Sequence, residues 1–475
     1  MPPSSRTFKV HTSILFDPKK KAFLKNISIE VDQASGSIIN VYKRHDEDRT
    51  TFTRHDIDLT GQVVLPGFVD SHTHIFLHSY NERSGIQQMR DESAVERTVR
   101  ATNHARIALL SGYTTYRDLG TEALGSADAN LRDCINRGIT PGPRLFVATD
   151  ALASSGSYEI RRENRSTLEV PVASDVADGV DGVRAAVRRR VGAGADIIKI
   201  YADYRRKVMR FPNTEGADRI LFPPDRRNPA IPLYTQQEMM TTVDEARIAE
   251  VPVAAHCGEA RTAIFAARAG VTSVEHVFED TYGKLDEMIK ELVKNKVIWV
   301  PTLATAEAEA PQFLDWCKSA VKKAHDAGVR LAAGGDTGAF HHGLNVREME
   351  LMIEAGIPLE DVLEACTVGG WEACGGDLCG FRFGWFAKGN RADIIALATD
   401  PRKDRKALRK VSFVMKDGQV WKKDGVPLGL VNYPQWPDEE AEAESSDEWT
   451  ELSTAQPTMS MSVPLPVCRS TGSLS

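Results

Sequence analysis

The chain has 475 residues, 42% of them hydrophobic, and a formal net charge of −7, so it is long enough to bury a large core. The charge comes without a basic stripe, which argues against nucleic acid or an anionic membrane surface as partner and favours a small-molecule substrate. No apolar run approaches the roughly 20 residues of a membrane-spanning helix, and "MPPSSRTFKV" lacks the apolar part of a signal peptide, which predicts a cytoplasmic protein.

The two ends of the chain are predicted to be rich in β-strands. Alternating segments such as "KNISIEVD" and "GSIINVYKR" occur between about Thr7 and Thr60 and predict a small antiparallel sheet. Similar segments return late in the chain, in "ADIIALATD" and "VSFVMKDGQVWKKDG". We therefore expect residues 1–66 and 381–430 to form a small β-sandwich domain.

Between these ends, short β-branched segments alternate with amphipathic helical stretches, a pattern typical of βαβ units and a parallel sheet. Eight strands are predicted, and they end at His72, Asp118, Thr149, Tyr201, His256, His276, Thr302 and Asp336. This number predicts an α/β fold with a (β/α)8 TIM-type barrel over residues 67–380. For the long connection at 151–181, a lid over the site and an irregular loop without a role both stay open.

The composition changes at the C-terminal end. Residues 431–475 are first acidic and then rich in Ser, Thr and Pro. Such a segment has little to bury, so we expect a disordered tail, which either docks a partner or is a solvated extension.

Polar residues mark the C-terminal ends of the predicted strands, the face on which barrels carry their active sites. In "GFVDSHTHIF", His72 and His74 are two residues apart, so in a strand both rings point to one side. Alone, each of the other residues has a structural explanation: Lys199 could extend to solvent, His256 could be a core residue, and Asp336 could cap a helix. Taken together, the four histidines, the lysine and the aspartate would be buried polar groups without partners; the fourth histidine is His276.

A metal centre supplies these partners. Imidazoles and a carboxylate are ligands for zinc or a similar divalent ion, and four histidines with one aspartate exceed the needs of one tetrahedral site. Two metal ions are therefore predicted. A lysine ammonium beside two cations is unfavourable, whereas a lysine carboxylated by CO₂ is an anion that can bridge them, and Lys199 is predicted to take this form.

These motifs resemble the amidohydrolase superfamily in its binuclear form with a carboxylated lysine. The stretches "DIIKIYADYR", "PVAAHCGEA", "SVEHVFED" and "GGDTGAFHHGLNVREMELM" resemble its imidazolonepropionase-like branch, which includes Xaa-Pro dipeptidases and the fungal ochratoxin amidase. The resemblance covers about residues 5–425. It implies that His72, His74 and Asp336 bind the more buried metal ion. It also implies that His256 and His276 bind the second ion and that Lys199 bridges the two.

For such a centre we expect a metal-bridging hydroxide to attack the scissile carbonyl near neutral pH. Asp336 is expected to accept the proton and pass it to the leaving amine. Tyr201 is expected to hydrogen-bond the developing oxyanion, and His342 to approach the site. For Arg205 and Arg206, binding of a substrate carboxylate and exposure in a loop both stay open.

The predicted function is hydrolysis of an amide bond in a small molecule, such as a dipeptide, an N-acyl amino acid or an ochratoxin-like amide. One alternative keeps the metal centre but cleaves a lactone, a cyclic amide or a carbamate. A second alternative is a scaffold without catalytic activity that binds a partner. The sequence does not predict the substrate or the metal beyond a preference for zinc, and a homo-oligomer is compatible with the helical outer surface of a barrel.

Overall fold

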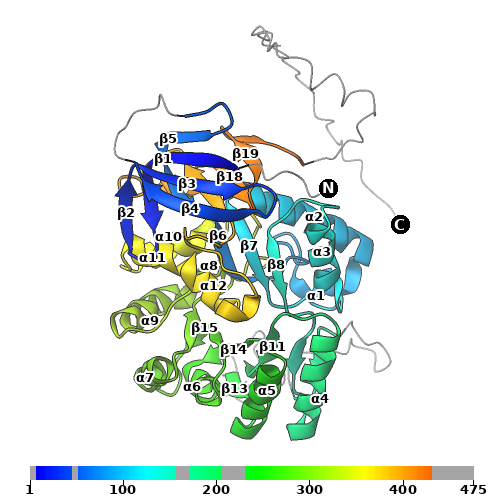
Figure 1. Ribbon diagram of the computed structural model, residues 1–475. Helices are drawn as coiled ribbons and strands as arrows, with labels where there is room; N and C mark the ends of the chain where they lie inside the picture. The colour runs from blue at the N-terminus through cyan, green and yellow to red at the C-terminus, as the bar shows by residue number, and fades with distance from the viewer. Residues whose placement is uncertain (1–6, 45–51, 157–171, 206–229, 431–475) are drawn as a thin grey trace, which may run out of the picture. The chain divides into compact units, whose positions relative to one another are not determined.

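The computed structural model describes residues 7–44, 52–156, 172–205 and 230–430, apart from the side chain of Arg205. Strands predominate at both ends of this part of the chain and alternate with helices between them, so it is an α/β protein (Figure 1). The predicted tail at 431–475 lies outside the described residues, as do residues 157–171 of the connection for which a lid and an irregular loop stayed open. Within the described ranges, every helix is too short or too polar to cross a membrane.

The strands are β1 (Thr7–Asp17), β2 (Ala22–Lys25), β3 (Ile27–Asp32), β4 (Ser37–Lys43), β5 (Ile57–Pro66), β6 (Phe68–Thr73), β7 (Tyr113–Asp118), β8 (Arg144–Val147), β9 (Ala151–Ala153), β10 (Ser174–Val176), β11 (Ile198–Tyr201), β12 (Asp203–Arg205), β13 (Ala230–Pro232), β14 (Val253–Glu259), β15 (Ser273–Glu279), β16 (Ile298–Val300), β17 (Ile394–Leu397), β18 (Val411–Lys416), β19 (Gln419–Lys423) and β20 (Val426–Pro427).

The helices are α1 (Gly85–Asp91), α2 (Ala94–Leu110), α3 (Ala127–Asn136), α4 (Gly179–Gly192), α5 (Gln236–Ile248), α6 (Ala260–Ala269), α7 (Leu285–Asn295), α8 (Leu303–Glu309), α9 (Leu314–Asp326), α10 (Val346–Glu354), α11 (Leu359–Ala365) and α12 (Val368–Ala373), with 3-10 turns η1 (Pro311–Phe313), η2 (Gly376–Cys379) and η3 (Arg405–Arg409).

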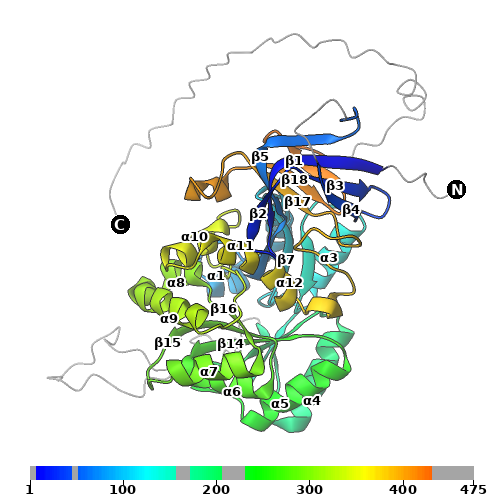
Figure 2. The same ribbon diagram turned by 60° about the vertical axis from the view of Figure 1, so that its left-hand side comes forward.

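Strands from both ends of the chain share one nine-stranded sheet in the order β20-β19-β18-β17-β5-β1-β3-β4, with β2 paired to β1. The blue and orange strands lie side by side in both views (Figures 1 and 2). The expectation of an antiparallel sheet was wrong for one pair, because β1 and β5 run parallel. A parallel pair needs a crossover between its strands, and β2 to β4 lie in that connection.

The central part of the chain holds parallel strands in two further sheets, β6-β7-β8 and β10-β9-β11-β14-β15-β16. Backbone hydrogen bonds link these sheets: Asp196 N–H donates to Val147 O at 2.8 Å, between the residues that precede β11 and the end of β8. On the far edge, Trp299 in β16 forms a parallel bridge with Leu331. Seven of the eight predicted strands are therefore present as β6, β7, β8, β11, β14, β15 and β16.

The eighth predicted strand, residues 330–336, is not a regular strand. Beyond the bridge to β16 it contacts β6, where Thr73 pairs with Thr337. Gly334 approaches β6 so closely that an added Cβ would lie 2.6 Å from the His72 nitrogen, and Asp336 has a left-handed φ of +60°. The close approach and the left-handed turn interrupt the ladder, and they bring Asp336 beside His72.

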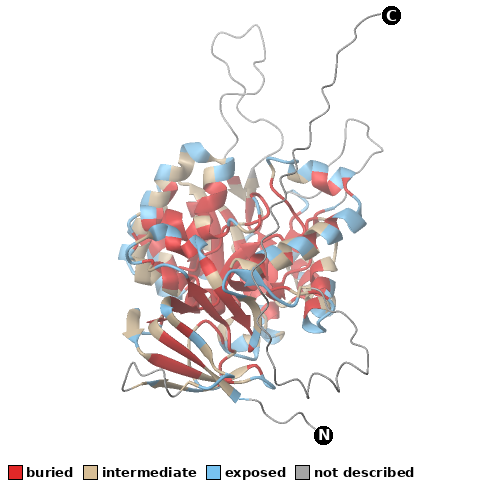
Figure 3. Cartoon of the chain, turned by 90° about the horizontal axis from the view of Figure 1, so that it is seen from above, coloured by how far each residue is buried: buried red, intermediate tan, exposed pale blue. Residues whose placement is uncertain are grey.

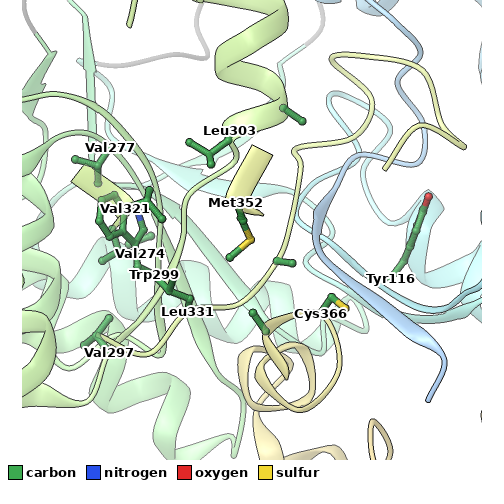
Figure 4. Close-up of a cluster of buried hydrophobic side chains, with 14 of the residues drawn as sticks. Tyr116, Val274, Val277, Val297, Trp299, Leu303, Val321, Leu331, Met352 and Cys366 are labelled. Carbon is green, nitrogen blue, oxygen red and sulfur yellow. The ribbon is translucent and has the colours of Figure 1, made fainter. Parts of the chain in front are cut away.

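Helices cover the central strands with their apolar sides, so buried residues lie inside and exposed ones outside (Figure 3). In one part of this core, Trp299 packs among Val274, Val321 and Leu331 (Figure 4). Its indole N–H donates to His276 O at 2.8 Å. The largest fully buried side chain of the described residues thus holds the backbone of a predicted metal ligand.

A methyl group at Gly334 is expected to destabilise the fold. Because the clash is with the backbone of His72, Gly334→Ala should lower the free energy of unfolding by about 2 kcal/mol, the range for overpacking. The control is Gly192→Ala at the end of α4, where an added Cβ meets nothing within 4 Å and stability should be unchanged or slightly higher. Urea unfolding of both variants measures this, and equal midpoints would contradict the close approach.

Glu348 on α10 is a buried carboxyl group that accepts the Ala304 N–H at 2.7 Å. Burial raises its pKa from 4.5 to about 8. A pKa raised by folding means that the native state holds the proton more tightly. Glu348 therefore makes its full contribution to the free energy of unfolding below about pH 4.5. This contribution is lost as the pH rises through about 8.

Glu348→Gln is expected to remove this pH dependence. At pH 9 the variant should be more stable than the wild type by about 3 kcal/mol, whereas near pH 5 the two should be alike. Denaturant unfolding at both pH values measures the difference, and Glu360→Gln on α11 serves as the control. A variant that is less stable than the wild type at pH 9 would show that the charged carboxylate is well accommodated.

Candidate metal centre

His72, His74 and Asp336 converge at the end of β6. His72 lies in β6 and His74 follows it directly, and their Nε2 atoms lie 3.5 and 3.3 Å from Asp336 Oδ1. The His276 ring lies 4.7 Å from the His72 ring. The ligand atoms of His72, His276 and Asp336 are all within 4.8 Å of one another, so these three residues form a group that could hold a metal ion.

The outer nitrogens of the first two histidines are held by acceptors. His72 Nδ1 donates to Glu275 Oε2 at 2.8 Å, and His74 Nδ1 donates to Gly120 O at 2.9 Å. In the neutral form of each ring, Nε2 carries a lone pair, and both Nε2 atoms face the Asp336 carboxylate. Acceptors that face one another are stable only with a cation or a proton between them, so this donor set fits a divalent ion.

The pKa values agree with this arrangement. Burial lowers the pKa of His72 and of His276 well below 6.5, so both are neutral, the form that binds metals. Burial also lowers the pKa of His74, but the Asp336 carboxylate raises it more, to about 9, so without a metal ion a proton lies between His74 Nε2 and Asp336. For Asp336, burial raises the pKa, and the two imidazoles outweigh this and lower it below 3.8.

Lys199 lies in β11 with 1% of its surface exposed, and its Nζ is 3.4 Å from His72 Nε2. Burial lowers its pKa to about 8. Among the residues that the structure describes, no carboxylate forms an ion pair with this amine. Lys199 therefore reaches the histidine cluster as an amine that loses its proton more easily than an ordinary lysine.

His256 in β14 extends the cluster on the other side. Its ring lies 4.6 Å from the His276 ring and 5.1 Å from the Tyr201 ring. Its Nε2 is 3.8 Å from Asp203 Oδ1, a carboxylate that the Gly258 N–H holds at 2.7 Å. The structure thus brings all six predicted ligands to one place, with His256 and His276 beside His72, His74, Lys199 and Asp336.

The backbone around these residues is strained. His276 and Val277 have φ values of +70° and +69°, and Asp336 has +60°. A left-handed conformation costs about 1–3 kcal/mol for a residue other than glycine, and most for a β-branched one such as Val277. Such strain persists where the surrounding structure compensates for it, as the Trp299 hydrogen bond to His276 O does here.

The other predicted catalytic residues have protein partners. Tyr201 Oη donates to Glu122 Oε1 at 3.0 Å. His342 is buried, its Nε2 donates to Leu77 O at 3.1 Å, and its ring stacks on His104 with the centroids 4.1 Å apart. The backbone of Arg205 lies in β12, whereas its side chain and all of Arg206 lie outside the described residues. Roles for these residues in substrate binding stay predictions.

A buried ion pair behind His72 was not predicted from the sequence. Glu275 in β15 accepts from Arg117 of β7 at 2.7 and 2.9 Å, and both residues are fully buried. Nor was Asp118, whose Oδ1 accepts the Ile75 N–H at 2.6 Å and whose pKa burial raises to about 7. The available signal was a charged residue at or near the end of a buried strand, in "TTYRD" and "TSVEH".

The fold and the site define an α/β protein with a buried group of histidines and an aspartate that could hold a divalent ion. Residues 63–422 match the model of the Amidohydrolase family, which is well over half of the chain. The chain belongs to this family and is a hydrolase that acts on carbon–nitrogen bonds. The family generally uses divalent metal ions.

Known proteins agree with this assignment. The ochratoxinase of Aspergillus niger is 28% identical over 417 residues, which cover 80% of this chain and 78% of the relative. The structure of an Xaa-Pro dipeptidase with methionine bound in its active site has a TM-score of 0.72 and 26% identity, and the match covers 88% of this chain and 100% of the dipeptidase. The A. niger ochratoxinase structure has a TM-score of 0.71 at 23% identity and covers 90% and 99%, which shows a shared fold.

Proposed function

We propose that the chain hydrolyses an amide bond of a small molecule at a centre of two zinc ions. The observation that carries this proposal is the pair of histidine Nε2 atoms that face the Asp336 carboxylate beside the buried amine of Lys199. In this proposal His72, His74 and Asp336 bind one metal ion, and His256 and His276 bind the other. Lys199, carboxylated by CO₂, would supply an anion to both metal ions.

We also propose that the central strands close into a (β/α)8 barrel over residues 67–380. The Asp196 to Val147 hydrogen bond and the bridges at Leu331 and Thr337 support a continuous ring of strands. In this proposal residues 1–66 and 381–430 form the β-sandwich. The parallel order would place all six ligands at the C-terminal ends of the strands.

The metal ions would make a water molecule more acidic and polarise the scissile carbonyl. Asp336, which His72 and His74 keep ionised, accepts a proton from the attacking water on a carboxylate oxygen and delivers it to the leaving nitrogen. Tyr201 stabilises the oxyanion after its hydroxyl exchanges its hydrogen bond with Glu122. Arg205 binds a carboxylate of the substrate.

For the substrate we propose a dipeptide, an N-acyl amino acid or an ochratoxin-like amide. An ochratoxinase and an Xaa-Pro dipeptidase are among the similar proteins, which supports a small substrate with an amide bond. His342, whose Nε2 donates to Leu77 O at 3.1 Å, is proposed to approach this substrate.

Purified protein supplied with Zn²⁺ and bicarbonate is expected to cleave members of a panel of dipeptides, N-acyl amino acids and aryl amides, followed by mass spectrometry. With ¹³C-bicarbonate, a carbamate resonance should appear in the ¹³C NMR spectrum and be absent from Lys199→Met. The protein could instead carry two metal ions and cleave only lactones, cyclic amides or carbamates. This result would favour the alternative function, in which the same metal centre hydrolyses one of these bonds. Folded protein that binds no metal ion would favour the scaffold.

A further inference from the structure

A cavity of about 420 Å³ lies apart from the metal centre. It is bounded by α8, α10, the start of β7, and strands β18 and β19 of the terminal sheet. Its volume is in the range of small-molecule sites, which are mostly apolar with a few polar groups. The apolar residues of its wall include Leu110, Tyr113, Phe340, Val346, Leu408 and Val411.

The cavity is not lined by any of the six proposed metal ligands, although Phe340 of its wall lies beside Gly335, the neighbour of Asp336. Tyr113 is the first residue of β7, at the opposite end of that strand from Asp118, and Val411 begins β18 in the terminal sheet. The proposed ligands lie in or just after the C-terminal halves of the parallel strands. A molecule in this cavity would therefore occupy a second site.

Lys422 on β19 is a half-buried ammonium in the wall of this cavity. Its Nζ donates to Leu110 O, at the end of α2, at 3.0 Å. In the described part of the chain, no carboxylate pairs with it, and burial lowers its pKa. An ammonium has three N–H donors, so two of them are available to a ligand.

The other charges that line the cavity have partners. Arg347 forms ion pairs with Glu307 at 2.7 Å and with Glu354 at 2.7 Å, and Arg409 pairs with Glu350. These pairs leave Lys422 as the cation of the wall that has no carboxylate partner among the described residues. A half-buried charge of this kind is stabilised most by an anionic group that accepts its hydrogen bonds.

We propose that this cavity binds a small apolar molecule with one carboxylate group. The carboxylate accepts hydrogen bonds from Lys422, and the apolar part packs against Tyr113, Phe340 and Val411. The charge of Lys422 selects the carboxylate over a neutral head group, and the volume of the cavity limits the length of the apolar part.

The test uses the full metal-loaded chain and octanoate as the probe, with 1-octanol as its neutral match. Isothermal titration calorimetry should show octanoate binding at least about tenfold more tightly than 1-octanol, since a hydrogen bond between charged groups is worth that much. Lys422→Met should remove this preference. The control is Lys423→Met, because Lys423 is the exposed neighbour on the same strand.

A second variant fills the cavity instead of removing its charge. Ala308 on α8 lines the cavity, so Ala308→Trp should abolish binding of both probes while circular dichroism and metal content stay as in the wild type. Octanoate binding that is unchanged in Lys422→Met would place the carboxylate at the metal centre and overturn the proposal. Absence of octanoate binding would also overturn the proposal. A dimer that dissociates in Ala308→Trp would overturn it in favour of a second copy of the chain as the occupant of the cavity.

Discussion

Replacing Asp336 with asparagine is expected to lower kcat by about 10³-fold, within the range for loss of a general base, and to change KM much less. Asparagine keeps an oxygen in the position of Oδ1 but cannot accept the proton of the attacking water. In the wild type, His72 and His74 lower the pKa of Asp336, so this carboxylate is ionised and ready to accept a proton at neutral pH. Steady-state kinetics on a substrate from the amide panel measures the effect.

Metal analysis must accompany this measurement, because Asp336 is also a proposed ligand. Variant protein that retains two metal ions and loses turnover identifies proton transfer as the missing step. If the variant protein loses a metal ion, the main role of Asp336 is metal binding. The matched control is Asp244→Asn on the exposed side of α5, and an Asp336→Asn protein with wild-type kcat would contradict the proposed role.

Replacing Glu275 with glutamine is expected to weaken metal binding by about 10–100-fold, the range for a partner that orients a ligating histidine. Glu275 fixes His72 Nδ1 as the donor at 2.8 Å, which leaves the lone pair on the Nε2 that faces Asp336. The substitution also leaves Arg117 as a buried charge without its carboxylate. The free energy of unfolding should therefore fall by about 3 kcal/mol.

A double variant separates these two effects of Glu275. Arg117→Met in the Glu275→Gln background removes the uncompensated charge, so part of the stability should return while metal affinity stays low. Competition with a metal-chelating dye gives the affinity, and urea unfolding of the metal-free protein gives the stability. If the single variant binds metal as tightly as the wild type, Glu275 serves only to neutralise Arg117.

Local patterns in the sequence were sufficient to predict most strands and the residues that follow them. Strands β6, β11, β14 and β15 lie where alternation and β-branched runs placed them, and each carries or precedes a predicted ligand. His72 and His74 share a side because a strand repeats every two residues. Parallel strands place their C-terminal ends on one face, so positions far apart in the chain could be grouped from the sequence.

The sequence by itself therefore determined the α/β class, the family and the set of histidines, lysine and aspartate that meet. Only the tertiary structure decided how they are held: the left-handed turn at Asp336, the irregular segment before it, and the Arg117–Glu275 pair behind His72. Glu275 and Arg117 are 158 residues apart, and strand alternation alone would turn Glu275 away from its neighbour His276. Such contacts depend on which distant segments pack together and exclude water, and this information is not present in any local pattern of residues.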